Sequence, residues 1–217
     1  MISKPTIYIH ADDYGLTKGI TRSLDKLIDK SNINSVSVIV NGYEDSEFIL
    51  DNNVRISSHI NIFENKPISD KDNLIDILDK NGRFRESFVF YLFVYYFGSS
   101  LKRQKIKSQI RIEVESQLNL LAETIGGFER IESIDSHNHV HMIPYIFDIF
   151  ADSCNKYNIK QIRTAREIFY FNFSKTNFFY IHFYIGIIKQ ILLKFFSFIN
   201  NKTVKKNNLI TNKYFIG

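Results

Sequence analysis

IESIDSHNHVHMIP, residues 131–144, joins a β-prone run to three histidines at alternate positions and then to a proline. The chain has 6 histidines in 217 residues, and half of them, His137, His139 and His141, begin two residues after the carboxylate of Asp135. Side chains two apart in an extended strand point to the same face, so we expect the three imidazoles to line one surface. Such a concentration of polar rings indicates a metal or acid–base role rather than a plain core.

Strands and helices are predicted to alternate on both sides of this stretch. The β-prone runs cover residues 6–10, 35–40, 54–62, 131–135 and 159–163. The helical runs cover residues 20–28 after Thr17, residues 106–125 before Gly126 and Gly127, and the residues from Pro144 onward. Alternation of this kind predicts a parallel α/β sheet or barrel, with its functional site at the carboxyl ends of the strands.

Polar side chains occur where three of these strands end. Asp12 and Asp13 close the first strand, His59 lies in or just after the third, and His137 follows the fourth. One carboxylate and two imidazoles form a ligand set that leaves positions open for water and substrate, which suits Zn²⁺ or another divalent ion used as a Lewis acid. Each segment alone has a plainer explanation, which is a solvated turn for the acid pair and a strand histidine for His59.

Composition indicates one soluble globular domain, since 44% of the residues are hydrophobic and 24% are charged. The net charge of +5 is small and scattered, and no nucleic-acid-binding motif is present, so a nucleic-acid partner is not expected. Cys154 is the single cysteine, which excludes an intrachain disulfide and a cysteine-based zinc site. The first residues reach two acids too soon for a signal peptide, so we expect a cytoplasmic protein.

The stretch 169–217 is rich in Phe, Ile, Asn and Lys. Residues 178–199 approach the length of a membrane span, but His182, Lys189 and Lys194 interrupt them, and charges near the centre of a span are costly. A membrane span, an amphipathic helix at a membrane surface, and a helix packed on a core or partner stay open, with the last favoured. Residues 88–97, FVFYLFVYYF, are too short to span a bilayer and predict a buried or lid-like helix.

Three motifs resemble those of the YdjC-like carbohydrate deacetylases, the group that includes chitooligosaccharide and hopanoid-biosynthesis deacetylases. HADDYGLTKGI (10–20) is similar to their ADDFG-type opening, SSHINI (57–62) to their second motif, and IDSHNHVHMIP (134–144) to their third, which is the most specific. IRTAREI (162–168) resembles a weaker fourth motif that contains arginine. The resemblance runs from about residue 6 to residue 167 and thins beyond it.

The resemblance implies a distorted β/α barrel, here incomplete, with residues 1–168 as a metal-dependent deacetylase-like β/α domain. Residues 169–217 would form a hydrophobic and basic segment of the same domain. The implied reaction removes an acetyl group from an N-acetylated saccharide, as an oligosaccharide, polysaccharide or glycolipid, through water activated by a divalent metal. Magnesium or zinc is the expected ion.

The resemblance also implies roles for individual residues. Asp13, His59 and His137 would be the metal ligands, and Asp12 the base that takes a proton from the attacking water. Asp135 is expected to orient an imidazole by accepting its free N–H.

The remaining candidates follow from their positions near the motifs. His141 is expected to contact substrate, whereas His139 would either do the same or support the end of the strand. Tyr14 would stack on a sugar ring. Arg163 and Arg166 would hold a carboxylate or orient Asp12, with a surface salt bridge to Glu167 as the alternative.

The chain departs from the family pattern in two respects. Family members are longer and carry a histidine segment of the His-Pro type near the carboxyl end that is thought to supply the general acid, and this segment is missing. The strands are too few to close an eight-stranded barrel unless the 169–217 segment adds some. Three explanations compete: a truncated reading frame, a fragment completed by another chain, and a shortened member that uses His141 as the acid.

Two other functions therefore stay open. One is a non-catalytic, truncated relative that binds metal or sugar, and the other is a metal phosphoesterase. A homodimer is expected only as the commonest soluble assembly, and contact of residues 169–217 with a membrane surface is a further hypothesis.

Overall fold

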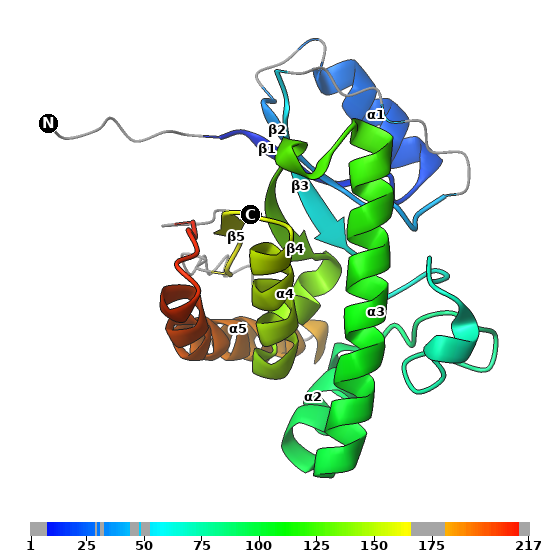
Figure 1. Cartoon of the computed structure of the whole chain (residues 1–217), viewed down its shortest axis with the longest axis vertical. Helices are drawn as coiled ribbons and strands as arrows, with labels where there is room; N and C mark the ends of the chain where they lie inside the picture. Colours follow the sequence, from blue (N-terminus) through cyan, green and yellow to red (C-terminus); the bar gives the residue numbers. More distant parts are fainter. Residues whose placement is uncertain are drawn as a thin grey trace, which may run out of the picture.

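The structure is a computed structural model that describes residues 8–28, 30, 33–43, 48, 53–165 and 181–212, with the side chains of residues 181–185 left out. Its centre is a sheet of five parallel strands in the order β1-β2-β3-β4-β5 (Figure 1). The strands are β1 His10–Tyr14, β2 Ser35–Val38, β3 Arg55–Ile60, β4 Ile131–Ser136 and β5 Gln161–Ile162. The helices are α1 Lys18–Ile28, α2 Phe88–Phe97, α3 Ser100–Ile125, α4 Pro144–Lys156 and α5 Ile181–Lys206, with short 3-10 helices at Lys71–Asn73 (η1), Phe128–Arg130 (η2) and His137–Met142 (η3).

The parallel α/β architecture is confirmed, whereas a closed barrel is not. The strands follow one another in chain order, so β1 and β5 form the two edges of the sheet that the described residues build. Beyond β5, Ile210 makes a single parallel bridge to Gln161, with Ile162 N donating to the carbonyl of Ile210 at 3.0 Å. The end of the chain therefore extends the sheet by one bridge at this edge.

Predicted helix signals coincide with the start of α1, the end of α3 and the start of α4, whereas α3 begins before the predicted residue 106. Thr17 Oγ1 accepts a hydrogen bond from Ile20 N at 3.2 Å at the start of α1, as expected for an N-cap. The helix α3 begins after Ser99, whose side chain accepts from Lys102 N, and ends at Gly126 in a left-handed conformation with φ 94°. Pro144 occupies the first turn of α4, where its missing N–H is not needed.

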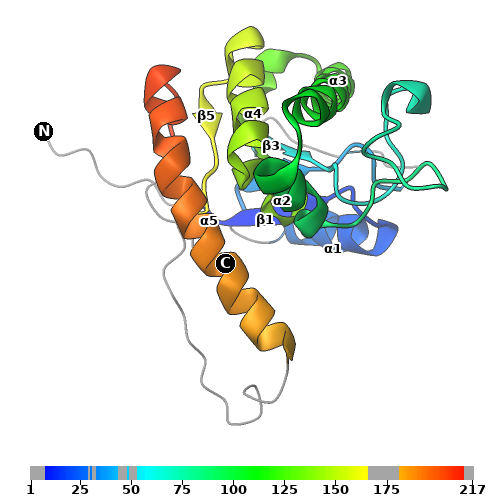
Figure 2. The same ribbon diagram turned by 90° about the horizontal axis from the view of Figure 1, so that it is seen from below.

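The core lies between the sheet and the helices that cover it. In α3 the buried apolar residues recur at helical spacing, and they are Ile106, Ile110, Val114, Leu118, Leu121, Ala122 and Ile125. These side chains join those of the sheet, such as Val36, Ile56 and Ile134, in one cluster of buried residues. Figure 2 shows α5 running beside α4 near β5, at the edge of the sheet.

The helix α2, and the helix α5 within the 169–217 segment, lie at the surface. In α2, Tyr91 and Val94 are buried, whereas Val89, Phe93 and Phe97 are exposed, so this helix is only half covered. The contact between α2 and α5 includes the rings of Tyr95 and Phe196, whose centroids are 6.1 Å apart. Within the described residues, no helix is both long enough and apolar enough to cross a membrane.

Two local departures from the prediction change the geometry at the strand ends. The strand β1 continues past Asp12 and Asp13, which were predicted to close it, and ends at Tyr14. The extended conformation predicted for residues 137–141 is wrong, because β4 ends at Ser136 and the chain turns into η3 with Asn138 and His139 in left-handed conformations, φ 55° and 58°. The three alternate histidines therefore do not share one strand face.

Candidate metal centre

Asp13, His59 and His137 come together at the carboxyl end of the sheet, from β1, β3 and the start of η3. Their ligand atoms all lie within 4.8 Å of one another. Asp13 Oδ1 is 2.8 Å from His137 Nδ1 and 3.4 Å from His59 Nε2. Two atoms that each bind one ion at about 2.0–2.2 Å lie about 2.8–3.6 Å apart, so this spacing fits a shared divalent ion.

A bulge in β1 brings both adjacent acids toward the same region. Neighbouring residues of a regular strand point to opposite faces, but the pairing with β2 shifts register between Ala11 and Tyr14, and Asp13 has a φ of 65°. Aspartate tolerates the left-handed region better than most residues, and bulges commonly re-aim side chains beside functional sites. Asp13 therefore faces His137 while Asp12 faces Arg163.

Each imidazole of this trio is held by a carboxylate on its far nitrogen. His59 Nδ1 forms a very short contact with Asp135 Oδ1, and His137 Nε2 lies 2.9 Å from Glu64 Oε1. A far nitrogen that donates its proton to a carboxylate leaves the near nitrogen free to bind a metal. Both rings are thus presented to one point, with His59 offering Nε2 and His137 offering Nδ1.

Asp12 belongs to a second polar cluster directly beside this trio. Its Oδ1 accepts from Arg163 Nη1 at 2.8 Å and lies 3.1 Å from His10 Nε2, and Arg163 Nε forms an ion pair with Asp135 Oδ2 at 2.6 Å. His10, Asp12 and Asp135 form a second group with metal-ligand spacing. Because the guanidinium of Arg163 already stands between the two carboxylates, we assign no ion to that group.

The electrostatics of the cluster keep its carboxylates ionised. Burial opposes the charge of Asp12, but the hydrogen bond from His10 and the charges of Arg163 and His59 outweigh it and hold the pKa of Asp12 well below its usual range. The pKa of Asp13 is likewise held low against burial, by hydrogen bonds from His137 and His59.

The pKa values of Asp135 and His59, the buried members of the cluster, are also shifted by their neighbours. Burial opposes the charge of Asp135, but Arg163 and His59 hold its pKa far below the usual value. Burial also disfavours protonation of His59, yet the charge of Asp135 and the hydrogen bond to Asp13 raise its pKa from 6.5 to about 9. In the absence of a metal, a proton on His59 therefore balances part of the negative charge.

The geometry disfavours the role as general acid that was predicted for His141. The side chain is 1% exposed, with Nδ1 2.7 Å from Ser136 Oγ and Nε2 2.9 Å from the carbonyl oxygen of Arg163. Both ring nitrogens are thus engaged, and burial lowers the pKa of His141 to about 4. His139 lies partly buried next to His141, with its pKa lowered to about 3 by burial and by His141.

Another predicted residue, Tyr14, does not join the site. Tyr14 is fully buried, its hydroxyl donates to Asp25 Oδ1 at 2.5 Å, and its ring packs against Phe48. A buried ring offers no face to a sugar, so the geometry argues against the predicted stacking role. Arg166 lies outside the described residues, whereas Arg163 makes the contact with Asp12 that was considered for it.

Sequence reasoning missed two residues of the cluster, His10 and Glu64. His10 accompanies Asp12 because residues two apart on a strand share a face, and it also contacts Ser35 Oγ at 2.7 Å and Ser37 Oγ at 2.8 Å. That two-residue spacing was a usable signal. Glu64 lies in the loop after β3, and no periodicity in the sequence predicts its contact with His137.

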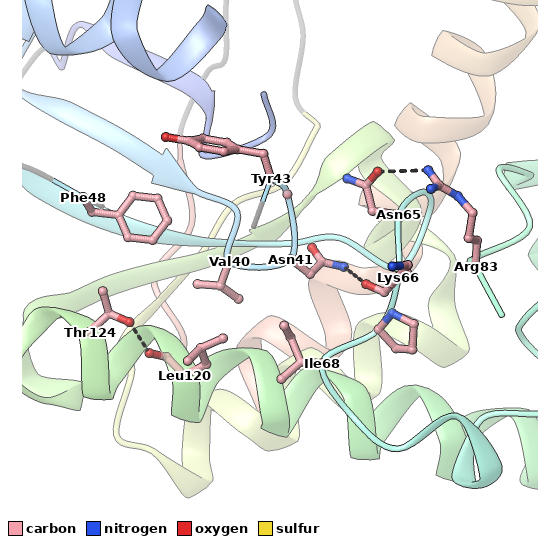
Figure 3. A pocket seen from close by; sticks show the side chains of 12 residues that line it. Val40, Asn41, Tyr43, Phe48, Asn65, Lys66, Ile68, Arg83, Leu120 and Thr124 are labelled. Carbon is pink, nitrogen blue, oxygen red and sulfur yellow. Dashed lines mark hydrogen bonds between the residues drawn. The ribbon is translucent and has the colours of Figure 1, made fainter. Parts of the chain in front are cut away.

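A cavity of about 530 Å³ lies next to the loop that carries Glu64, between the segments after β2 and β3 and the carboxyl-terminal part of α3 (Figure 3). Val40, Lys66, Arg83 and Leu120 are among its lining residues. None of the trio Asp13, His59 and His137 lines it, so we assign no ligand to this cavity.

Comparison with known proteins identifies the family of the chain. The model of a family described as "YdjC-like protein" matches residues 6–217. A carbohydrate deacetylase of Thermoanaerobacter pseudethanolicus is 27% identical over 157 residues, which cover 70% of this chain and 58% of that protein. Mouse carbohydrate deacetylase is 25% identical over 166 residues, which cover 74% of this chain and 51% of that protein.

The chain spans about half the length of the curated relatives that it matches. Among solved structures, a candidate cellobiose-phosphate cleavage protein of Enterococcus faecalis V583 has a TM-score of 0.56 at 13% identity, with 94% of this chain and 95% of that chain covered. That similarity concerns the fold alone. Because the family model matches almost the whole sequence, the chain belongs to the YdjC-like protein family.

Proposed function

We propose that this protein is a metal-dependent hydrolase that removes the acetyl group from an N-acetylated saccharide. The observation that carries the proposal is the convergence of Asp13, His59 and His137 on one point, with the ionised carboxylate of Asp12 beside it. The relatives named carbohydrate deacetylase support the choice of substrate class.

Asp13, His59 and His137 would hold the divalent ion. When bound, such an ion supplies Lewis acidity, which polarises an acetyl carbonyl and lowers the pKa of a water molecule. Zinc fits two imidazoles and one carboxylate best by ligand type. Two imidazoles are a less usual set for magnesium, so we favour zinc over magnesium here.

Asp12 would take the proton from the attacking water. Its Oδ1 is fixed by Arg163 and His10, and among the described residues no hydrogen bond reaches its Oδ2. One oxygen is therefore held in place, and the side chain of Asp12 is 35% exposed, so it is accessible to a reacting molecule. The low pKa of Asp12 makes it a weak base, so proton transfer depends on water that is itself made more acidic.

The leaving amine also needs a proton. With His141 buried and engaged at both nitrogens, we infer that protonated Asp12 returns the proton it has received. Its low pKa makes the protonated form a ready donor.

The test compares metal binding with acetate release in one set of proteins. Purified wild type, Asp12→Asn and Asp13→Asn are freed of metal with a chelator, reloaded with zinc, and incubated with N-acetylchitooligosaccharides. We expect Asp13→Asn to lose both zinc and acetate release. Asp12→Asn should keep zinc and lose about 10²- to 10⁴-fold in acetate release, the usual contribution of a general base.

Asp72→Asn, at an exposed aspartate of η1, is the matched control and should behave as wild type. Wild-type protein that binds zinc but releases no acetate from any N-acetylated saccharide would point instead to a non-catalytic relative. Wild-type protein that binds no divalent ion would refute the metal centre itself.

A further inference from the structure

We propose that Glu64 positions the metal-ligating imidazole of His137 and thereby sets the affinity of the centre for its ion. This inference rests on the metal centre proposed above. Its structural basis is the 2.9 Å contact between Glu64 Oε1 and His137 Nε2, on the side of the ring opposite Asp13.

The contact fixes both the tautomer and the tilt of the ring. In the metal-free structure Nδ1 hydrogen-bonds to Asp13 Oδ1 at 2.8 Å, and because Glu64 accepts the Nε2 proton, Nδ1 can give up its own proton and offer its lone pair to an ion. The ring of Phe63 meets that of His137 edge-on, with centroids 6.1 Å apart, and limits rotation from another side. The pair Glu64 and His137 repeats the arrangement of Asp135 and His59, so each metal-facing imidazole has its own carboxylate.

The backbone that carries Glu64 is itself held by side chains. Asn61 Oδ1 accepts from both Phe63 N and Glu64 N at 3.1 Å, which forms a tight turn directly after β3. Asn41 Nδ2 donates to the carbonyl oxygens of Asn61 and Lys66 and holds the turn from the segment after β2. Figure 3 shows the bond to Lys66.

A buried polar stripe on α3 holds the same loop from the other side. Gln117 accepts from Asn61 N and donates to Asn61 O, both at 2.9 Å, and it also donates to Glu113 Oε1. Glu113 in turn accepts from Ile68 N and Ser69 N at 2.9 and 3.0 Å. Gln117 and Glu113 are fully buried, four residues apart on one helix face.

Polar side chains in a core are costly unless they are bonded, and here most of their polar atoms bond the loop backbone. Among the described residues, Asn41 Oδ1 and Asn61 Nδ2 are buried without a hydrogen-bond partner. The bonds to the backbone give the turn after β3 a fixed shape. Glu64 therefore reaches His137 from a rigid base, as a carboxylate that orients a metal ligand requires.

The experiment measures zinc binding to chelator-treated protein by titration calorimetry. Glu64→Ala removes the acceptor, Glu64→Gln keeps an acceptor without the charge, and Glu123→Gln changes an exposed glutamate of α3 as the matched control. We expect Glu64→Ala to weaken zinc binding about 10- to 100-fold, with Glu64→Gln in between and Glu123→Gln unchanged.

A second measurement separates positioning from a general effect on the fold. In zinc-loaded wild type, the Nε2 proton of His137 should be visible in proton–nitrogen NMR spectra because it is hydrogen-bonded. It should persist in Glu64→Gln and disappear in Glu64→Ala, while the Nδ1–H of His59, bound to Asp135, stays visible in all proteins.

Wild-type affinity in both Glu64 variants would overturn the role of Glu64 and leave the metal centre intact. Absence of zinc binding by wild type would overturn both proposals together. If Glu64→Ala does not fold, the affinity and the His137 signal of Glu64→Gln carry the test.

Discussion

Arg163 is the residue on which the charge balance of the site depends. Its guanidinium meets Asp12 at 2.8 Å and Asp135 at 2.6 Å, while Asp135 also contacts His59. Asp135 is only 1% exposed, so water stabilises its charge very little. The planar guanidinium of Arg163 thus pairs with both Asp12, the proposed base, and Asp135, the carboxylate that orients His59.

Replacing Arg163 by glutamine should therefore destabilise the protein strongly. The buried charge of Asp135 would lose one of its two cationic partners, and breaking a buried pair of this kind costs about 3 kcal/mol or more. Urea unfolding monitored by circular dichroism measures the loss. Arg111→Gln is the control, because the exposed Arg111–Asp152 pair should contribute less than about 1 kcal/mol. Equal losses in the two variants would contradict the role given to Arg163.

Substitution of His141 separates a structural role for this side chain from a role as the catalytic acid. If His141 ties η3 to the segment after β5, His141→Leu should lower the free energy of unfolding by about 1–3 kcal/mol. The carbonyl of Arg163 would lose its side-chain partner, and Ser136 Oγ would keep only the backbone N–H of residue 141. Zinc affinity should change little, since His141 does not contact the trio. A catalytic acid would give the reverse pattern, with stability kept and acetate release lost.

The ligand candidates were predictable from sequence because parallel strands end at one edge of a sheet. Asp13, His59 and His137 each stand at such an end, and the structure brings them together. The positions of Tyr14 and His141 were not predictable in this way. Whether a polar ring near a motif is buried depends on side chains such as Asp25 and Ser136, which only the fold places beside it.

At the scale of elements, the turn after β1 depends on two glycines in close contact. A Cβ on Gly42 would lie 1.8 Å from the carbonyl oxygen of Gly15, and a Cβ on Gly15 would lie 2.3 Å from that of Ile39. Gly15 also has a φ of 97°, which favours glycine. The turn follows directly after Asp13, so this contact supports the bulge that aims its carboxylate.

Gly42→Ala should accordingly cost about 3 kcal/mol of folding free energy, because the obstructing atoms belong to the backbone and cannot rotate away. It should also weaken zinc binding by displacing Asp13. Gly19→Ala, at a position in α1 where a Cβ meets nothing within 4 Å, should instead stabilise the protein by up to about 1 kcal/mol. Thermal unfolding of both variants measures the difference. A Gly42→Ala protein that is as stable as wild type would show that the backbone at Gly15 and the backbone at Gly42 can move apart.

Elements with strong local signals were predicted from sequence, and those shaped by distant contacts were not. The helix α3 has a regular apolar stripe and a terminal glycine pair, and its predicted end agrees with the structure. The histidine run after β4 alternates like a strand, yet two consecutive left-handed residues turn it into η3. The bulge in β1 also escaped prediction, because pairing with β2 and the adjacent turn decide where it lies.

At the scale of the whole molecule, the buried histidines make stability depend on pH in opposite directions. His139 and His141 have pKa values lowered to about 3 and about 4, mainly by burial. Below pH 6.5 these two histidines bind protons in the unfolded chain but stay neutral in the folded protein. The free energy of unfolding therefore falls as the pH falls. The aspartates with lowered pKa values, Asp12, Asp13 and Asp135, add to this loss below about pH 4.

His59 acts in the opposite sense, because Asp135 and Asp13 raise its pKa from 6.5 to about 9. Its contribution to stability is complete below pH 6.5 and is lost as the pH rises toward 9. Metal-free protein should therefore be most stable near pH 6.5, which urea unfolding of chelator-treated protein at a series of pH values can measure. His59→Asn should remove the alkaline decline. Zinc should also remove it, because ligation requires a neutral imidazole and the ion replaces the proton that balances Asp13 and Asp135. A metal-free stability that stays constant from neutral to alkaline pH would refute the charge balance assigned to His59.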